Sequence, residues 1–457
     1  MNKQAQEEKH QLMTTAPVEK LVVKMAFPAL ISMMISSIYN MVDTLYVGRI
    51  STQAAGAVGV VFSYMSLIQA FAFFFGHGSA NFISRSLGAK NTDGAAKIAA
   101  TGFFSCFIIG LFFMLSGLLF MNPLLYLFGS TETILPDARG YFLYILLGTP
   151  FIMTSFVMNN QMRLQGNAHM GMIGMSAGAI MNIILDPIFI FAFDMGVGGA
   201  GLATAISQLV SFVVLLWLSG KRDGIPIKLS NFRPRLNHYK QIISGGMPSL
   251  ARQGITSVSN IVLNQLAGLY GDPAIAAFSI TARVMMLANS ALIGFGQGFQ
   301  PVCGFNFGAK LYSRVKKAFW FSVKVGTAYC LVCAAVGITF APQIISAFRG
   351  SDPELLKTGV AALRAQSLLF VLNGYIMITS MYLQNINKTF QASVVAMARQ
   401  GLFFIPIVYL LNLIIGLKGI IMSQPLSDIL TFVVSLVFGI RCLNSMGIND
   451  AVMQKIE

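Results

Sequence analysis

Apolar runs long enough to form membrane helices alternate with short polar stretches along almost the whole chain. The hydrocarbon core of a bilayer takes about 20 apolar residues of helix. Gly-Asp-Pro at 271–273 and Ser-Asp-Pro at 351–353 are typical breaks between such helices. The pattern therefore predicts an all-α, polytopic membrane protein with twelve transmembrane helices. They are expected at residues 22–48, 55–87, 95–121, 139–163, 170–193, 197–219, 241–269, 274–304, 317–342, 361–385, 391–416 and 419–442.

Composition supports this fold class over several soluble domains. The 457 residues are 55% hydrophobic and only 10% charged, which is typical of a membrane protein. A net charge of +15 would suggest nucleic acid as the partner of a soluble chain, but here it fits basic cytoplasmic loops. Cys330 and Cys333 form a CxxC pair inside an apolar run, without a second pair or a nearby histidine. This favours packing over metal binding, and no cofactor is expected.

The distribution of lysine and arginine predicts the orientation. Positive charge gathers in the N-terminal segment, in the stretches 85–97, 221–240 and 310–317, and at the C-terminus. By the positive-inside rule both termini are cytoplasmic. The first twenty residues lack the apolar core and small-residue cleavage site of a signal peptide, so we expect the first helix to insert uncleaved.

The two halves of the chain repeat each other at an offset of about 220 residues. That offset relates Pro28 to Pro248, Asn40 to Asn260, and Gly88-Ala89-Lys90 to Gly308-Ala309-Lys310. Six helices per repeat insert both halves in the same orientation, an architecture typical of transporters with a substrate site between the repeats near the membrane midplane. We expect a cytoplasmic tail at 1–20, an N-lobe at 21–219, a basic linker at 220–240, a C-lobe at 241–443 and a second tail at 444–457. The linker is interpreted as a solvated loop facing lipid headgroups.

Acidic side chains within the predicted spans are the strongest functional signal. An aspartate in a membrane helix costs about 2.5 kcal/mol or more and marks a functional site by default. Asp43 lies in the first span, three residues after Asn40 and on the same helical face. In the fifth span Asn182 and Asp186 are four residues apart, and Pro187 follows. A proline there removes a backbone hydrogen bond and predicts an interrupted helix.

The acids are distributed unequally between the repeats. The offset relates Asp43 to Leu263, and the local offset of 219 relates Asp186 to Ile405, so only Asp428 is a comparable acid in the second half. The sixth span opens with GVGGAG at 196–201, where small residues allow another helix to approach closely, and Thr204 follows. Carboxylate, amide, hydroxyl and carbonyl oxygens suit a proton or a sodium ion. We therefore expect an asymmetric cation site in the first half.

Three motifs give the chain a family resemblance. They are FPALI followed by N-x-x-D (27–43), GHGSANFISRSLGAKN (76–91) and MNIILDPIFIF with GVGGAGLATAISQ (181–208). With them the chain resembles the multidrug and toxic compound extrusion (MATE) family, and within it the bacterial branch of DinF-like and MepA-like exporters. The resemblance implies two six-helix lobes, a bacterial plasma membrane location and efflux coupled to H⁺, Na⁺ or both. It also implies a coupling site formed by Asp43, Asn182, Asp186 and Thr204. The second-lobe acids of the family's other branch are absent where the repeat would place them.

Adaptable apolar residues and a few amides predict the walls of a multidrug cavity. Methionine is flexible and polarisable, which suits promiscuous binding, although most methionines simply pack in cores. The expected partners are small-molecule drugs, mostly organic cations, and the lipid bilayer, with no nucleic acid and a monomeric transporter. The candidate substrate-binding residues are Met33, Met34, Tyr39, Asn40, Met158, Gln161, Asn260, Asn264, Met285 and Met286.

Three other functions remain as alternatives. A flippase or exporter of a lipid-linked metabolite on the same wider fold would need several intramembrane arginines. The candidates for such arginines are Arg252 and Arg283 only, which are few. An embedded enzyme would need a catalytic motif, but the spans contain no HExxH. A channel would need neither the acidic site nor the long repeat. His77 is interpreted as structural rather than as a proton carrier.

Overall fold

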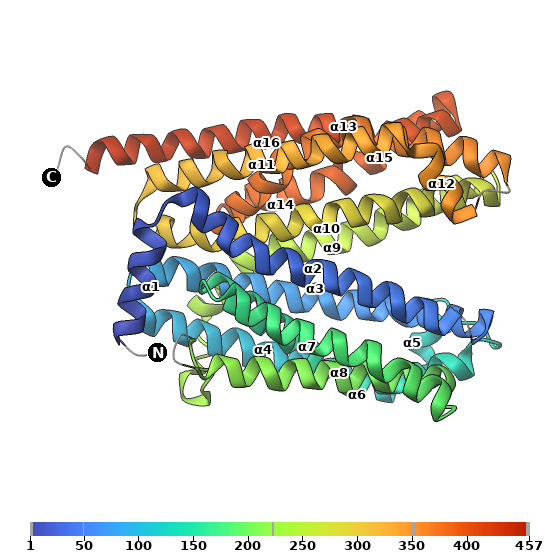
Figure 1. Ribbon diagram of the computed structural model, residues 1–457, viewed down its shortest axis with the longest axis horizontal. Helices are drawn as coiled ribbons and strands as arrows, with labels where there is room; N and C mark the ends of the chain where they lie inside the picture. The colour runs from blue at the N-terminus through green and yellow to red at the C-terminus, as the bar shows by residue number, and fades with distance from the viewer. Residues whose placement is uncertain (1–2, 49, 222–223, 350–351, 454–457) are drawn as a thin grey trace. The chain divides into compact units, whose positions relative to one another are not determined.

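The computed structural model describes residues 3–48, 50–221, 224–349 and 352–453, and this part of the chain is helical with no strand. The prediction of an all-α membrane protein is confirmed. Figure 1 shows the helices as long rods joined by short connections. In chain order they are α1 (Lys3–Thr15), α2 (Val18–Gly48), α3 (Thr52–Gly88), α4 (Thr92–Leu119), α5 (Met121–Leu127), α6 (Leu135–Leu164), α7 (Ala168–Pro187), η1 (Ile188–Ala192), α8 (Gly196–Ser219), η2 (Leu229–Asn231), α9 (Leu236–Gly268), α10 (Asp272–Gly308), α11 (Tyr312–Thr339), α12 (Ala341–Arg349), α13 (Pro353–Asn385), α14 (Thr389–Met397), η3 (Ala398–Leu402), α15 (Phe404–Ile415) and α16 (Leu417–Met453).

Every predicted span corresponds to a helix. Among the described residues, eleven helical segments are long and apolar enough to cross a membrane. The remaining predicted span, 241–269, corresponds to α9 and ends one residue beyond it; α9 is long enough to cross but carries Arg252, Gln253 and several other polar residues. The fifth and eleventh spans each contain a π-helical turn, η1 and η3 respectively.

Three α-helices, α1, α5 and α12, lie wholly or mostly outside the predicted spans. The sequence interpretation treated the first twenty residues as a polar tail, whereas α1 is docked on the rest of the first half. Its Met13 is fully buried, Lys9 Nζ donates to Asn167 Oδ1 at 2.6 Å, and His10 Nε2 lies 2.9 Å from the Gly88 carbonyl oxygen. One buried apolar residue per two or three turns is too weak a pattern to predict such a helix.

The chain divides into two compact units. The first comprises Met1–Ala16 and Lys24–Gly246, and the second comprises Pro17–Val23 and Met247–Glu457. The first turns of α2 therefore belong with the second unit, where Glu19 Oε1 pairs with Lys317 Nζ at 3.1 Å.

Each unit is built around one central helix in the same way. In the first unit α6 packs against α3, α4 and α8, and α7 packs against α8. In the second unit α13 packs against α10, α11 and α16, and α15 packs against α16. The matching arrangement is what two repeats of one six-helix design would produce.

The basic segment between the halves is anchored rather than fully solvated. The Ile225 N–H donates to Gln165 Oε1 at 3.0 Å, and Ile225 itself is buried. Arg233 exchanges main-chain hydrogen bonds with the Thr101 hydroxyl on α4. The described lysines and arginines of this segment nevertheless remain exposed. Apolar residues therefore anchor the segment, and the basic residues face outward.

Candidate functional site

Asn182, Asp186 and Thr204 form a hydrogen-bonded cluster between α7 and α8. The Asn182 side-chain amide donates to Asp186 Oδ1 at 3.1 Å and to Thr204 Oγ1 at 3.4 Å. All three side chains are buried, and Asp186 is completely so. The i, i+4 spacing on α7 is what places the amide and the carboxylate side by side.

Local backbone features bring the cluster together. Pro187 ends α7 immediately after Asp186, and the chain continues as the π-helical turn η1, so the predicted interruption of the fifth span is confirmed. Gly201 on α8 lies against α6, where an added Cβ would stand 2.8 Å from the Tyr141 carbonyl oxygen. The predicted close approach at the GVGGAG segment is therefore also confirmed, and it holds Thr204 beside α6 and α7.

Asp43 on α2 belongs to the same electrostatic neighbourhood. Its side chain is buried and interacts electrostatically with Asp186. Tyr39, one turn earlier on α2, interacts with both carboxylates. Of the four residues expected to form the coupling site, Asn182, Asp186 and Thr204 are thus joined by hydrogen bonds, and Asp43 lies near enough to Asp186 to interact with it electrostatically.

Tyr141 is a member of this cluster that the sequence interpretation missed. It is buried on α6, its hydroxyl hydrogen-bonds with the Thr204 side chain, and it interacts electrostatically with Asp43. A tyrosine within an apolar span needs a partner for its hydroxyl, which was the available signal. Its partner could not be identified before the close α6–α8 packing was known.

Three oxygens of the cluster are buried without a hydrogen-bond partner among the described residues: Asp43 Oδ1, Asn182 Oδ1 and Asp186 Oδ2. Buried polar atoms are normally satisfied, so each such atom requires an explanation. The carboxylates can accept protons, and all three oxygens can coordinate a hard cation. In the described part of the chain no three histidine, cysteine or acidic side chains come together, so the cluster differs from a transition-metal site.

The candidate substrate residues of the first half have different environments. On α2, Met34 is exposed and Met33 and Tyr39 are partly exposed, whereas the side chain of Asn40 lies outside the described residues. Met158 on α6 is buried in a cluster with Phe103 and Leu215. Gln161 is also buried, and its amide donates to Ser79 Oγ at 2.9 Å and to the Ala99 carbonyl oxygen at 3.1 Å.

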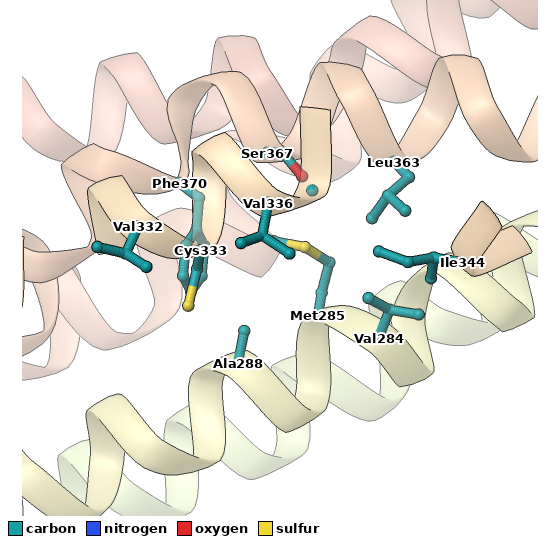
Figure 2. Close-up of a pocket in the computed structure, with 11 residues that line it drawn as sticks. Val284, Met285, Ala288, Val332, Cys333, Val336, Ile344, Leu363, Ser367 and Phe370 are labelled. Atoms are coloured by element: carbon teal, nitrogen blue, oxygen red, sulfur yellow. The ribbon is translucent and has the colours of Figure 1, made fainter. Parts of the chain in front are cut away.

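In the second half, Asn260 and Asn264 lie on an exposed face of α9. Met285 and Met286 diverge, because Met286 is 63% exposed while Met285 points into the second unit. There Met285 lines a cavity of about 180 Å³ together with Phe370 and Cys333 (Figure 2). The cavity is almost entirely apolar, with the Ser367 hydroxyl and the Cys333 thiol as its polar side-chain groups.

Arginines other than Arg252 and Arg283 also lie within the spans, so the restriction of intramembrane arginines to those two was wrong. Arg163, at the end of α6, is buried and interacts with Asn160 and His77. Arg399, in η3, pairs with Asp428 on α16. An arginine near a helix end is usually interpreted as reaching the interface, and only the fold reveals these buried partners.

A model of the MatE family matches residues 28–188 and 248–410. The chain belongs to the MatE family of transporters. The two matches of this MatE protein begin at Pro28 and Pro248, the pair related by the 220-residue offset, which confirms the internal repeat. Membership also identifies the chain as a transporter rather than an enzyme.

The relatives of this MatE protein match it over nearly its whole length. The multidrug export protein MepA of Staphylococcus haemolyticus (strain JCSC1435) is 25% identical over 440 residues, covering 96% of this chain and 97% of the relative. MepA of Staphylococcus aureus (strain NCTC 8325 / PS 47) is 26% identical, covering 90% and 91%. Among solved structures, the outward-facing conformation of a multidrug resistance MATE family transporter of the MOP superfamily has a TM-score of 0.89 at 26% identity and covers 96% and 98% of the two chains.

Proposed function

We propose that this MatE transporter is a cation-coupled multidrug antiporter of the bacterial plasma membrane. It exports amphiphilic, mostly cationic organic compounds in exchange for H⁺, Na⁺ or both, and acts as a monomer with both termini in the cytoplasm. The multidrug export proteins among its relatives support the substrate class. The excess of lysine and arginine in the expected cytoplasmic loops supports the orientation.

One observation carries the coupling proposal: two buried carboxylates, Asp43 and Asp186, each keep an oxygen without a hydrogen-bond partner among the described residues. Charged groups are costly inside a membrane, so such oxygens favour a bound proton or cation. Asn182 holds Asp186 in place and is itself hydrogen-bonded to Thr204, and the side-chain amide oxygen of Asn182 adds a third ligand atom. The two carboxylates would titrate as a coupled pair.

The membrane potential and the ion gradients supply enough free energy to drive this exchange. One charge moving through 100 mV supplies about 2.3 kcal/mol, and one pH unit supplies about 1.4 kcal/mol. An ion entering the first-unit cluster would stabilise the state that releases drug outward, and loss of the ion to the cytoplasm would restore the drug-binding state. Exposed members of the candidate substrate set, including Met34, Met286, Asn260 and Asn264, would supply adaptable contacts.

The test is efflux from proteoliposomes that contain the purified full-length protein. A fluorescent organic cation such as ethidium is loaded, and a proton gradient and a sodium gradient are imposed separately. We expect efflux with at least one of the two gradients, and the gradient that supports it identifies the ion. Efflux that proceeds equally with no gradient, or that requires neither ion, would disprove coupled antiport.

A further inference from the structure

The second unit contains a buried ion pair that the coupling proposal does not use. Arg399 Nε donates to Asp428 Oδ1 at 2.9 Å, and Arg399 Nη2 lies 3.5 Å from Asp428 Oδ2. The Asp428 side chain is 1% exposed, and Gln424 Nε2 donates a further hydrogen bond to its Oδ1 at 2.7 Å. Both carboxylate oxygens of Asp428 are therefore engaged.

The backbone around Arg399 is held as firmly as its side chain. Ser427 Oγ donates to the Arg399 carbonyl oxygen at 2.7 Å, and the Gln424 amide reaches the same oxygen at 3.5 Å. Ser259 on α9 donates to the carbonyl oxygen of Gln400, the next residue of the π-helical turn η3. A π-helical turn leaves carbonyl groups without their usual helical donors, and these side chains supply replacements. The guanidinium is consequently presented from a fixed position.

Part of that guanidinium remains available to a ligand. Arginine has five N–H donors, and Asp428 is approached by only Nε and Nη2. The other donors make no hydrogen bond to a residue that the structure describes, while the Arg399 side chain is 16% exposed. Arg399 is thus the accessible side chain of the pair. Its free donors form a planar set that matches the geometry of a carboxylate.

Apolar surface lies close to this group. Arg399 interacts electrostatically with Cys330 on α11. Cys333 lies one turn further along the same helix and lines the apolar cavity with Met285 and Phe370 (Figure 2). A molecule with an acidic group and an apolar body would find both kinds of partner within the second unit.

The pair is confined to one repeat. At the local offset of 219 Arg399 corresponds to Ile180, and at the offset of 220 Asp428 corresponds to Gln208 and Gln424 to Thr204. The first unit thus has carboxylates without a basic partner, whereas the second has an arginine whose charge is balanced and whose remaining donors are accessible.

We propose that Arg399 binds the carboxylate of acidic or zwitterionic drugs, with Asp428 and Gln424 positioning its guanidinium. This inference rests on the proposed function and extends its substrate class beyond organic cations. Asp428 balances the arginine charge in the absence of drug, so no uncompensated cation is left within the membrane.

The test compares two fluorescent probes that differ only in the acidic group. Tetramethylrhodamine carries a free carboxylate, and its methyl ester does not. Binding to the full-length protein in nanodiscs is measured by fluorescence anisotropy, with empty nanodiscs as the background. Losing a hydrogen bond to a charged group costs about 1.5–3 kcal/mol, so Arg399→Gln should weaken binding of the acid by roughly 10- to 100-fold and leave the ester unchanged.

The double variant Arg399→Gln with Asp428→Asn separates recognition from folding, because it leaves no unpaired buried carboxylate. It should bind the ester normally and the acid weakly. If it binds the acid as the wild type does, or if the single variant weakens both probes equally, the pair is structural and the inference is wrong. A wild-type protein that binds the ester but not the acid also overturns it. Failure of the wild type to bind either probe would instead contradict the proposed drug export.

Discussion

The Asn182 amide donates to Asp186 Oδ1 at 3.1 Å, one turn away on α7, and this contact orients both side chains. Since the amide nitrogen also reaches Thr204 Oγ1, Asn182 Oδ1 and Asp186 Oδ2 are left as the acceptors without partners among the described residues. A helix interrupted by Pro187 thus carries two oriented oxygens at membrane depth. This is the physical basis for the proposal that ion coupling takes place in the first unit.

Replacing Asp43 by asparagine should abolish gradient-driven efflux while leaving drug binding measurable. The amide is similar in size but neither ionises nor carries the charge needed to bind H⁺ or Na⁺. Efflux from proteoliposomes should fall to the rate of protein-free vesicles, and binding of the drug should be measured on the same preparation.

The repeat provides a matched control for that experiment. Leu263 occupies the corresponding position of the second half, where Leu263→Asn introduces the same amide without removing an acid. We expect Leu263→Asn to lower thermal stability slightly and to retain coupled efflux. Equal loss of coupling in both variants would show that the effect comes from a polar group in the helix and not from Asp43.

The close approach of α8 to α6 at Gly201 should make this position intolerant of a side chain. The Cβ of Gly201→Ala would lie 2.8 Å from the Tyr141 carbonyl oxygen, so the two helices must separate. Overpacking of this kind costs about 1–3 kcal/mol. We expect a lower midpoint in thermal unfolding of the purified protein, with weaker coupling because Thr204 moves away from Tyr141.

Gly59 on α3 is the control for this substitution, because an added Cβ would meet nothing within 4 Å. Alanine has a higher helix propensity than glycine by about 1 kcal/mol. Gly59→Ala should therefore leave the unfolding midpoint unchanged or raise it. A Gly201→Ala protein as stable as the wild type would show that α8 can shift without cost.

The long spans were predictable from the sequence because each is a continuous run of apolar residues long enough to cross a bilayer. Asp43 and Asp186 could be singled out because aspartate is rare in such runs, and their role in coupling stays a prediction. Tyr141 and Arg399 were not identified, since their roles depend on Thr204 and Asp428, partners on other helices. The short helix α1 was missed for a related reason, as contacts with Gly88 and Asn167 stabilise it rather than its own amphipathic pattern.

The ion pair between α1 and the turn after α3 should be visible in the titration of Glu7. Lys90 Nζ donates to Glu7 Oε1 at 2.8 Å, and this hydrogen bond and charge lower the pKa of the Glu7 carboxyl below its ordinary value. A lowered pKa means that the pair stabilises docked α1 above the ordinary pKa, and that this contribution is lost as pH falls through the lowered pKa. In ¹³C NMR of the labelled carboxyl, Lys90→Met should return the midpoint to the ordinary value, whereas Lys20→Met should not. An unchanged midpoint in Lys90→Met would show that the ion pair does not form in solution.

The Arg399–Asp428 pair should show strong, non-additive effects on stability. Removing one partner of a buried ion pair strands the other charge and costs about 3–5 kcal/mol, whereas removing both is often close to neutral. Asp428→Asn should therefore lower the free energy of unfolding more than the double variant Arg399→Gln with Asp428→Asn does. Thermal or denaturant unfolding in detergent of the wild type, both single variants and the double variant completes the cycle. Additive losses would mean that Arg399 already escapes to a solvated position. In that case its guanidinium would not be held by Asp428, and the fixed donor geometry that distinguishes a carboxylate from its ester would be lost.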